Sequence, residues 1–236
     1  MERRTLYLKI WETLAAEKGM IFLAGPRQAG KTTLGRIIAE GFPNNLYCNW
    51  DIPEHRAALL ENPTFFTALS RHDASCPLIV FDEIHKYRDW KNYLKGVYDQ
   101  YNGEYRFLVT GSGRLDLYQK GGDSLAGRYL LFHLWPFTVG ELCARNTSMT
   151  AFLCNPLAIT MDNGAAISAT WEKLETLSGF PEHFLNGKPA SWRRWSNGYG
   201  RQLIREDIRE LSDVRAVSDM ETLYHLLPSR VGSPLS

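Results

Sequence analysis

Short apolar runs alternate with segments of helical periodicity through the first 134 residues of the chain. The apolar runs predict five β-strands, at 20–25, 45–50, 76–82, 105–112 and 128–134. The intervening patterns predict helices at 31–41, 53–61, 63–71, 89–102 and 114–119. Because the runs are almost continuously apolar, we expect strands covered on both faces, as in a parallel sheet. The pattern therefore predicts an α/β fold in which helices sandwich the sheet.

The first 19 residues predict an amphipathic helix, with one apolar face formed by Leu6, Ile10, Trp11 and Leu14. Charged residues interrupt any signal-peptide core there, and no apolar run approaches the roughly 18 residues of a membrane span. The formal net charge of the 236-residue chain is +1, which argues against a basic tail for nucleic acid or membrane. The four cysteines form no C-x-x-C pair, so neither a metal site nor a disulfide framework is indicated. We expect a cytoplasmic protein without a membrane partner.

The pattern changes after Leu134. Thr138 and Glu141 have the spacing of a capping box and predict the start of a helix. Residues 144–169 are small, polar and irregular, whereas the pattern from Thr170 onward is helical. We therefore divide the chain into a core, an irregular insertion or linker, a helical subdomain and the start of a further region, at 1–143, 144–169, 170–228 and 229–236.

The residues between the first predicted strand and the next helix have the spacing of a phosphate-binding loop. Gly25 and Gly30 enclose four residues, and Lys31 and Thr32 follow directly. Glycines let the backbone fold tightly, so that successive N–H groups and the positive end of the helix dipole face phosphate oxygens. Lys31 would supply a cation to the outer phosphates, and Thr32 a hydroxyl to Mg²⁺. The expected phosphate-binding residues are Gly25, Pro26, Arg27, Gln28, Ala29, Gly30, Lys31, Thr32 and Thr33.

Two acids, Asp82 and Glu83, follow the third predicted strand. Ligands of open α/β sheets bind at the carboxyl ends of the strands, which places both carboxylates near the phosphate loop. Asp82 would hold Mg²⁺, directly or through a water, and Glu83 would orient and deprotonate an attacking water. A glutamate beside the metal-binding aspartate favours hydrolysis over transfer to an acceptor hydroxyl.

The fourth predicted strand ends in Thr110 and Ser112, which are candidates to hydrogen-bond the attacking water or the terminal phosphate. Turn chemistry is the alternative, since glycines flank Ser112. Phosphoryl transfer also needs a cation for the charge that develops. Arg128 and Arg114 are the candidates for this role, and each could equally be a surface arginine.

Two further patterns favour a structural explanation. Asp51 and Glu54 have capping-box spacing beside a proline, which we prefer to a direct role at the nucleotide. Four residues recur at helical spacing and favour a core stripe over a base-stacking surface: Trp192, Trp195, Tyr199 and Leu203.

Six segments in order carry a resemblance to a known family: "GPRQAGKTTL", "LIVFDEIHKYRDWKNYLKGVYDQY", "FLVTGSGRLDLY", "SLAGRYLLFHLWPFTVGEL", "SGFPEHF" and "REDIREL". Together they resemble the AAA-type ATPases of bacteria and archaea that carry a C-terminal domain of unknown function. The resemblance runs from about Thr5 to the end of the chain. Family members usually continue past a point like Ser236, so we expect either a fragment of a longer protein or a naturally short version.

The resemblance implies an ASCE-type P-loop NTPase sheet with strand order 5-1-4-3-2. It implies ATP as the nucleotide, and the chain shows no [NT]KxD guanine motif. It assigns Lys31 and Thr32 to phosphate and metal, and Asp82 and Glu83 to metal and water. It also assigns residues 110–112 to a sensor strand, while Arg128 matches the GR motif of the family.

Three functions follow from these patterns. The first is an Mg²⁺-dependent ATPase that acts as a switch or motor on a protein or nucleic-acid partner. The second is a nucleotide-binding module with little turnover, and the third is a small-molecule kinase. Glu83 favours the first over the third, and steady phosphate release without an acceptor would separate the first from the second. No pattern identifies the partner or decides whether the chain forms a homo-oligomer.

Overall fold

The computed structural model describes residues 4–112, 115, 125–143, 164–204 and 217–232. Its strands are β1 (Met20–Ala24), β2 (Asn45–Asn49), β3 (Leu78–Asp82), β4 (Arg106–Thr110) and β5 (Leu130–His133). They form one five-stranded sheet in the order β2-β3-β4-β1-β5, with every neighbouring pair parallel. Read from the other edge this is 5-1-4-3-2, which confirms the expected P-loop NTPase sheet.

Both faces of the sheet are covered, which explains the continuous apolar runs. Along β1, Met20, Phe22 and Ala24 pack into one core, whereas Ile21 and Leu23 pack into the other. Every residue of β1 and of β3 is buried. A strand buried on both faces has no need of polar residues at alternate positions.

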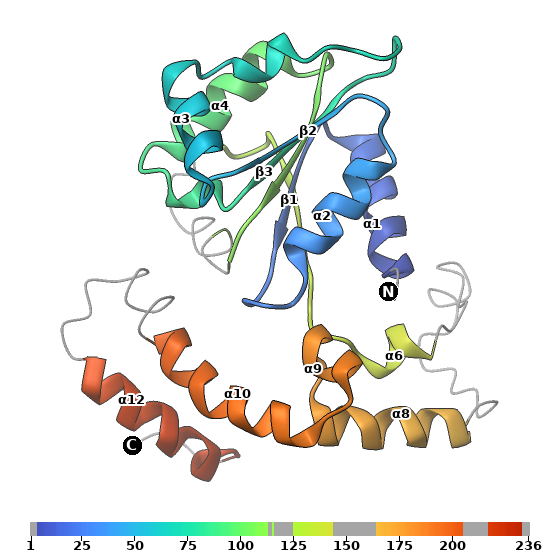
Figure 1. Ribbon diagram of the computed structural model, residues 1–236, viewed down its shortest axis with the longest axis vertical. Helices are drawn as coiled ribbons and strands as arrows, with labels where there is room; N and C mark the ends of the chain where they lie inside the picture. Colours follow the sequence, from blue (N-terminus) through green and yellow to red (C-terminus); the bar gives the residue numbers. More distant parts are fainter. Residues whose placement is uncertain (1–3, 113–114, 116–124, 144–163, 205–216, 233–236) are drawn as a thin grey trace.

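Two helical layers provide this cover (Figure 1). On one face lie α1 (Thr5–Glu17) and α2 (Lys31–Glu40). On the other lie α3 (Pro53–Glu61), the 3₁₀ turn η1 (Phe65–Ala68) and α4 (Trp90–Tyr101). Because α2 starts directly after the loop that leaves β1, its N-terminus lies at the carboxyl edge of the sheet.

The buried face of α1 differs from the predicted one. Its buried residues recur every four positions, at Tyr7, Trp11 and Ala15, while Leu6 is 50% exposed. Ile10 and Leu14 pack only partly against the core. The prediction was therefore wrong for Leu6, because the aromatic ring of Tyr7 takes the inward position.

The helix predicted at 63–71 is reduced to the single turn η1. Asn62 Oδ1 accepts hydrogen bonds from both the backbone N–H and the hydroxyl of Thr64, and the Thr67 hydroxyl donates to the Thr64 carbonyl. Side chains that satisfy the backbone locally compete with a longer helix. The helix predicted at 114–119 lies outside the described residues, except for residue 115.

The C-terminal part of the chain is helical, as expected. Its elements are α6 (Val139–Leu142), α8 (Gly164–Leu177), α9 (Pro181–Asn186), α10 (Pro189–Gln202), α12 (Val217–Leu226) and η4 (Leu227–Arg230). They lie together beyond one end of the sheet (Figure 1). Helix α8 begins inside the range predicted to be irregular, six residues before 170, and residues 144–163 lie outside the described part. Among the described helices, none is long and apolar enough to cross a membrane.

The aromatic stripe of α10 packs within this helical part. Trp195 stacks on Tyr199 with ring centroids 4.3 Å apart, and both rings contact Phe180. His183 of α9 lies against Trp192 and Trp195. The contacts support a structural role for the stripe, but all four of its residues are half-buried, so it is not the fully buried core that the spacing predicted.

Candidate functional site

The loop between β1 and α2 has the backbone of an anion-binding turn. Gly25, Gln28 and Gly30 all have positive φ angles, of 152°, 62° and 96°. Gly30 is the N-cap residue of α2 and offers no side-chain acceptor to the first turn. The N–H groups of that turn are therefore available to an anionic ligand, in the positive end of the helix dipole.

Gly25 is fixed by its surroundings as well as by its φ angle. A Cβ at this position would overlap the backbone carbonyl of Leu134, the residue just after β5. We expect Gly25→Ala to destabilise the fold by about 2–3 kcal/mol through strain and overlap. A thermal unfolding curve measures this, and Gly140→Ala is the matched control, since open space surrounds Gly140 in α6. Equal unfolding temperatures for the two variants would contradict the assigned loop geometry.

Lys31 lies over this loop. Its side chain is buried, and its Nζ donates hydrogen bonds to the carbonyl oxygens of Gly25 and Pro26, at 2.9 and 2.8 Å. The ammonium group is thus held at the inner side of the loop by oxygen atoms. Phosphate oxygens could replace these carbonyls without moving the lysine out of the loop.

Asp82 gathers four donors at the carboxyl end of β3. The Thr32 hydroxyl donates to Asp82 Oδ2 at 2.8 Å, and the Thr110 hydroxyl donates to Oδ1. The Tyr47 hydroxyl and Asn49 Nδ2 also donate to Oδ2. Burial, reinforced by the Asp82 carboxylate, raises the pKa of Tyr47 to about 12. The residue predicted to hold a metal is therefore joined directly to the start of α2 through Thr32.

Glu83 follows with an unusual backbone and a charged neighbour. Its φ of 57° is rare for a residue with a side chain, and such strain collects at functional sites. Lys86 Nζ lies 3.3 Å from Glu83 Oε2 and 2.6 Å from Asp51 Oδ2. Burial raises the pKa of Glu83, while the positive charge of Lys86 opposes that shift. Burial alone would lower the pKa of Lys86, but its two carboxylate partners outweigh burial and raise it.

The capping role preferred for Asp51 is wrong. The N-cap residue of α3 is Ile52, and no side chain caps this helix. Asp51 instead pairs with Lys86, which comes from the segment after β3. An ion pair formed across the carboxyl edge of the sheet thus replaces the local capping contact.

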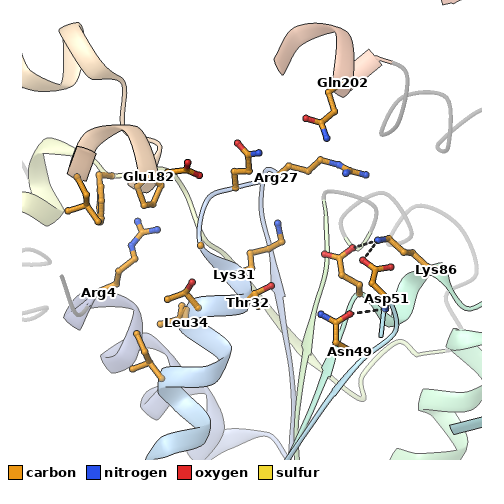
Figure 2. Close-up of a pocket in the computed structure, with 18 residues that line it drawn as sticks. Arg4, Arg27, Lys31, Thr32, Leu34, Asn49, Asp51, Lys86, Glu182 and Gln202 are labelled. Atoms are coloured by element: carbon orange, nitrogen blue, oxygen red, sulfur yellow. Dashed lines mark hydrogen bonds and ion pairs between the residues drawn. The ribbon is translucent and has the colours of Figure 1, made fainter. Parts of the chain in front are cut away.

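Most of these groups line one cavity of about 580 Å³, a size that suits a nucleotide. Asp82 is buried and is not among the lining residues, and neither are Gly25 and Pro26. One wall is the phosphate loop with the first turns of α2, and the opposite wall carries Asp51, Glu83 and Lys86. Figure 2 shows Lys31 and Thr32 between Asp51 with Lys86 on one side and Arg4 with Glu182 on the other. Residues of α9 and the end of α10 complete the lining. The helical part of the chain therefore contributes to the same cavity as the loop.

The predicted sensor residues have other partners. Thr110 reaches Asp82, as described above, and Ser112 Oγ lies 3.4 Å from His85 Nε2. Neither belongs to the described residues that line the cavity. Contact of Thr110 or Ser112 with water or phosphate stays a prediction.

Neither candidate arginine is among the described residues that line the cavity. Arg128 precedes β5 at the amino end of the sheet, where its Nε and Nη2 donate to the Asp99 carboxylate at 2.7 and 3.1 Å. This contact raises the pKa of Arg128 and lowers that of Asp99. Arg114 lies outside the described residues.

Sequence reasoning missed several residues of the site. Asn49 ends β2 at the same edge of the sheet as Asp82 and Thr110, so the rule that ligands bind at carboxyl ends would have found it. Lys86 stands three residues after Glu83 without a recognised motif. Arg4 lies far from the loop in sequence, and no local pattern signals its place beside it.

Comparisons with known proteins identify the family of the chain. A family model described as an AAA domain matches residues 17–143, more than half of the chain. Uncharacterized proteins of Mycobacterium bovis and Mycobacterium tuberculosis are each 27% identical over 196 residues, which cover 81% of this chain and 36% of each relative. The chain thus spans about a third of the length of these relatives.

Solved structures that resemble the chain include a Walker-type ATPase and a DnaA protein. The Walker-type ATPase PABY2304 of Pyrococcus abyssi is 18% identical, with a TM-score of 0.49 over 89% of this chain and 74% of that one. AMPPCP-bound DnaA from Aquifex aeolicus is 14% identical, with a TM-score of 0.42 over 92% and 73%. From the family match and the parallel sheet together, the chain belongs to the AAA domain family of P-loop ATPases.

Proposed function

We propose that this chain binds ATP with Mg²⁺ in the cavity at the carboxyl edge of the sheet and hydrolyses it. The observation that carries the proposal is the contact between Thr32 and Asp82, with Glu83 beside it in the cavity that Lys31 faces. The contact supports the proposal because it groups an ammonium that could pair with phosphate, a hydroxyl and a carboxylate that could hold Mg²⁺, and a second carboxylate that could act as a general base. Purified protein that releases phosphate from ATP without an added acceptor would support this function.

The oxygen atoms around Asp82 suit Mg²⁺. Thr32 Oγ1 and Asp82 Oδ2 are 2.8 Å apart, and hydroxyl and carboxylate oxygens are the ligands that Mg²⁺ prefers. Within the described ranges, no three His, Cys, Asp or Glu side chains gather as a metal cage. Thr32 and Asp82 would therefore hold the ion together with phosphate oxygens and water, as Mg²⁺ commonly requires. When bound, Mg²⁺ would neutralise charge on the phosphate oxygens.

The side chains of the site divide the remaining work. Lys31 would leave the carbonyls of Gly25 and Pro26 and pair with the outer phosphate oxygens. Glu83 would hold the attacking water and accept its proton as the water oxygen bonds to the terminal phosphorus. The bond from that phosphorus to the bridging oxygen then breaks, and ADP leaves with the bridging oxygen.

The charge that develops on the transferred phosphoryl group needs a further cation. Arg128 lies at the edge of the sheet opposite the cavity of the same chain. It therefore stays a candidate only if it enters the cavity of a neighbouring copy. A homo-oligomer is therefore part of the proposal. Mixing an Arg128→Ala variant with a Lys31→Ala variant tests it, because mixed assemblies would regain turnover only if the arginine acts between copies.

The runner-up function, a nucleotide-binding module with little turnover, is favoured by one observation. Lys86 engages the Glu83 carboxylate at 3.3 Å, which competes with the water that Glu83 would activate. The macromolecular partner, whether protein or nucleic acid, would then change the turnover. Steady phosphate release by the chain alone separates the two functions, and the same assay with DNA and RNA tests whether a nucleic acid changes the turnover.

We expect Asp82→Asn to weaken ATP binding about tenfold in Mg²⁺, because one charged ligand of the ion is lost. In EDTA the variant and the wild type should bind ATP with equal affinity. Isothermal titration under both conditions measures this, with the exposed Asp219→Asn of α12 as the matched control. An affinity loss of equal size in EDTA would show that Asp82 acts on the fold of the loop and not through the metal.

A further inference from the structure

Arg4 forms a buried cluster beside the phosphate loop. Its side chain is 6% exposed, although it lies at the start of α1, near the N-terminus. Nε and Nη2 donate to the two carboxylate oxygens of Glu141, at 2.7 and 2.6 Å. Nη2 also donates to the carbonyl of Trp135 at 2.6 Å, and Nη1 donates to the carbonyl of Ala29 at 3.0 Å. A single side chain thereby joins the N-terminus, the loop and the segment that leads into the helical part.

Both an ion pair and ring contacts hold the plane of the Arg4 guanidinium. Its Cζ lies 4.5 Å from the ring centroid of Tyr7 and 4.9 Å from that of Phe137. Glu141 is also buried, and its pairing with Arg4 is bidentate. The capping box predicted for Thr138 and Glu141 is consequently half made: the Thr138 hydroxyl accepts the Glu141 N–H, while the Glu141 carboxylate turns to Arg4.

The hydrogen bond from Arg4 to the Ala29 carbonyl sets the orientation of the peptide between Ala29 and Gly30. In a trans peptide the C=O and N–H groups point in opposite directions. Arg4 holds the carbonyl of Ala29, so the N–H of Gly30 must face the other way. Gly30 is the N-cap of α2 and lines the cavity, and Ala29 itself is fully buried.

We propose that Arg4 is a positioning residue of the nucleotide site: it sets the plane of the Ala29–Gly30 peptide so that the loop is preorganised for phosphate before the nucleotide arrives. This inference rests on the proposed function, since it concerns the same loop. Preorganised donors spare the ligand the cost of ordering them, and this gain appears as affinity. Arg4 also lines the cavity, but its guanidinium donors are already engaged by Glu141 and by the carbonyls of Trp135 and Ala29. We therefore assign its effect to the backbone and not to contact with phosphate.

The test must separate this role from a purely structural one. A lone Arg4→Met would strand the Glu141 carboxylate in a buried position and destabilise the fold. The double variant Arg4→Met with Glu141→Leu removes both charges, and such exchanges of a buried ion pair are often neutral for stability. We expect its unfolding temperature to return toward that of the wild type. Its affinity for MgATP should stay about tenfold lower, because the Ala29 carbonyl is still released.

Two further variants complete the experiment. Arg4→Lys keeps the charge near Glu141 but loses the planar set of donors, so it should also bind MgATP more weakly while it stays folded. Arg193→Met, on the exposed face of α10, is the matched control and should bind as the wild type does. Wild-type affinity in both the double variant and Arg4→Lys would overturn the inference and leave the proposed function intact.

A second readout does not depend on ATP. The amide of Ala29 donates to the Pro26 carbonyl, and that of Leu34 donates to the Gly30 carbonyl. Hydrogen exchange at these amides should be faster in the double variant than in the wild type, while exchange in β4 stays the same. If the folded wild type binds no ATP, the proposed function fails. Unchanged exchange at Ala29 and Leu34 then overturns the role of Arg4 as well, and faster exchange supports its hold on the loop.

Discussion

Lys31→Ala should lower the affinity for MgATP by at least about 100-fold while the chain stays folded. The ammonium group already rests on two loop carbonyls, and with ATP present it would exchange them for phosphate oxygens. Hydrogen bonds to charged groups each contribute about 1.5–3 kcal/mol, so the loss of two accounts for a change of this size. Equilibrium titration with MgATP measures the affinity, and circular dichroism checks the fold.

The exposed Lys9 of α1 offers the matched control for this prediction. Lys9→Ala removes the same charge from the chain and should bind MgATP as the wild type does. The unfolding temperature of Lys31→Ala without nucleotide should stay within a few degrees of the wild type, since Lys31 lines the cavity and water can enter the space that its side chain leaves. Unchanged affinity in Lys31→Ala would contradict a role for the loop in nucleotide binding.

Glu83→Gln should bind MgATP with nearly wild-type affinity but hydrolyse it roughly 10²–10⁴-fold more slowly, the usual contribution of general acid–base catalysis. Glutamine has the shape of glutamate and can still accept a hydrogen bond from Lys86, so the strained backbone at this position is retained. What it cannot do is accept a proton from water at neutral pH. Single-turnover hydrolysis measures the chemical step without interference from product release.

The matched control here is Glu104→Gln, an exposed glutamate that lies between α4 and β4. It removes the same charge and should leave both binding and hydrolysis unchanged. If Glu83→Gln hydrolyses ATP at the wild-type rate, another residue activates the water, and Glu83 is then a structural partner of Lys86.

The sheet was predictable because its physical basis is local. Continuous apolar runs identify strands that are buried on both faces, and the five observed strands lie within the predicted runs. The loop was predictable for a similar reason: Gly25 and Gly30 adopt positive φ angles that few other residues tolerate. The strand order came from the resemblance to a family and not from the residues themselves.

Predictions failed where a distant side chain competed with a local contact. Asp51 does not cap α3 and pairs with Lys86 instead. The helix predicted after Thr138 does begin there, but the carboxylate of Glu141 turns to Arg4. An ion pair with a buried or half-buried partner outweighs a capping bond, but sequence spacing gives no sign of the partner. The helical wall of the cavity was unpredictable for the same reason, because α9 and α10 reach the loop only through the tertiary fold.

Binding and turnover measured together in the wild-type chain decide whether the cavity is an ATPase site. Purified protein is titrated with MgATP to find the stoichiometry, and phosphate release is then followed at saturation without any acceptor. We expect one ATP bound per chain and a steady release of phosphate that requires Mg²⁺. Folded protein that binds no ATP, or that loses the terminal phosphate only to an added acceptor, would contradict it.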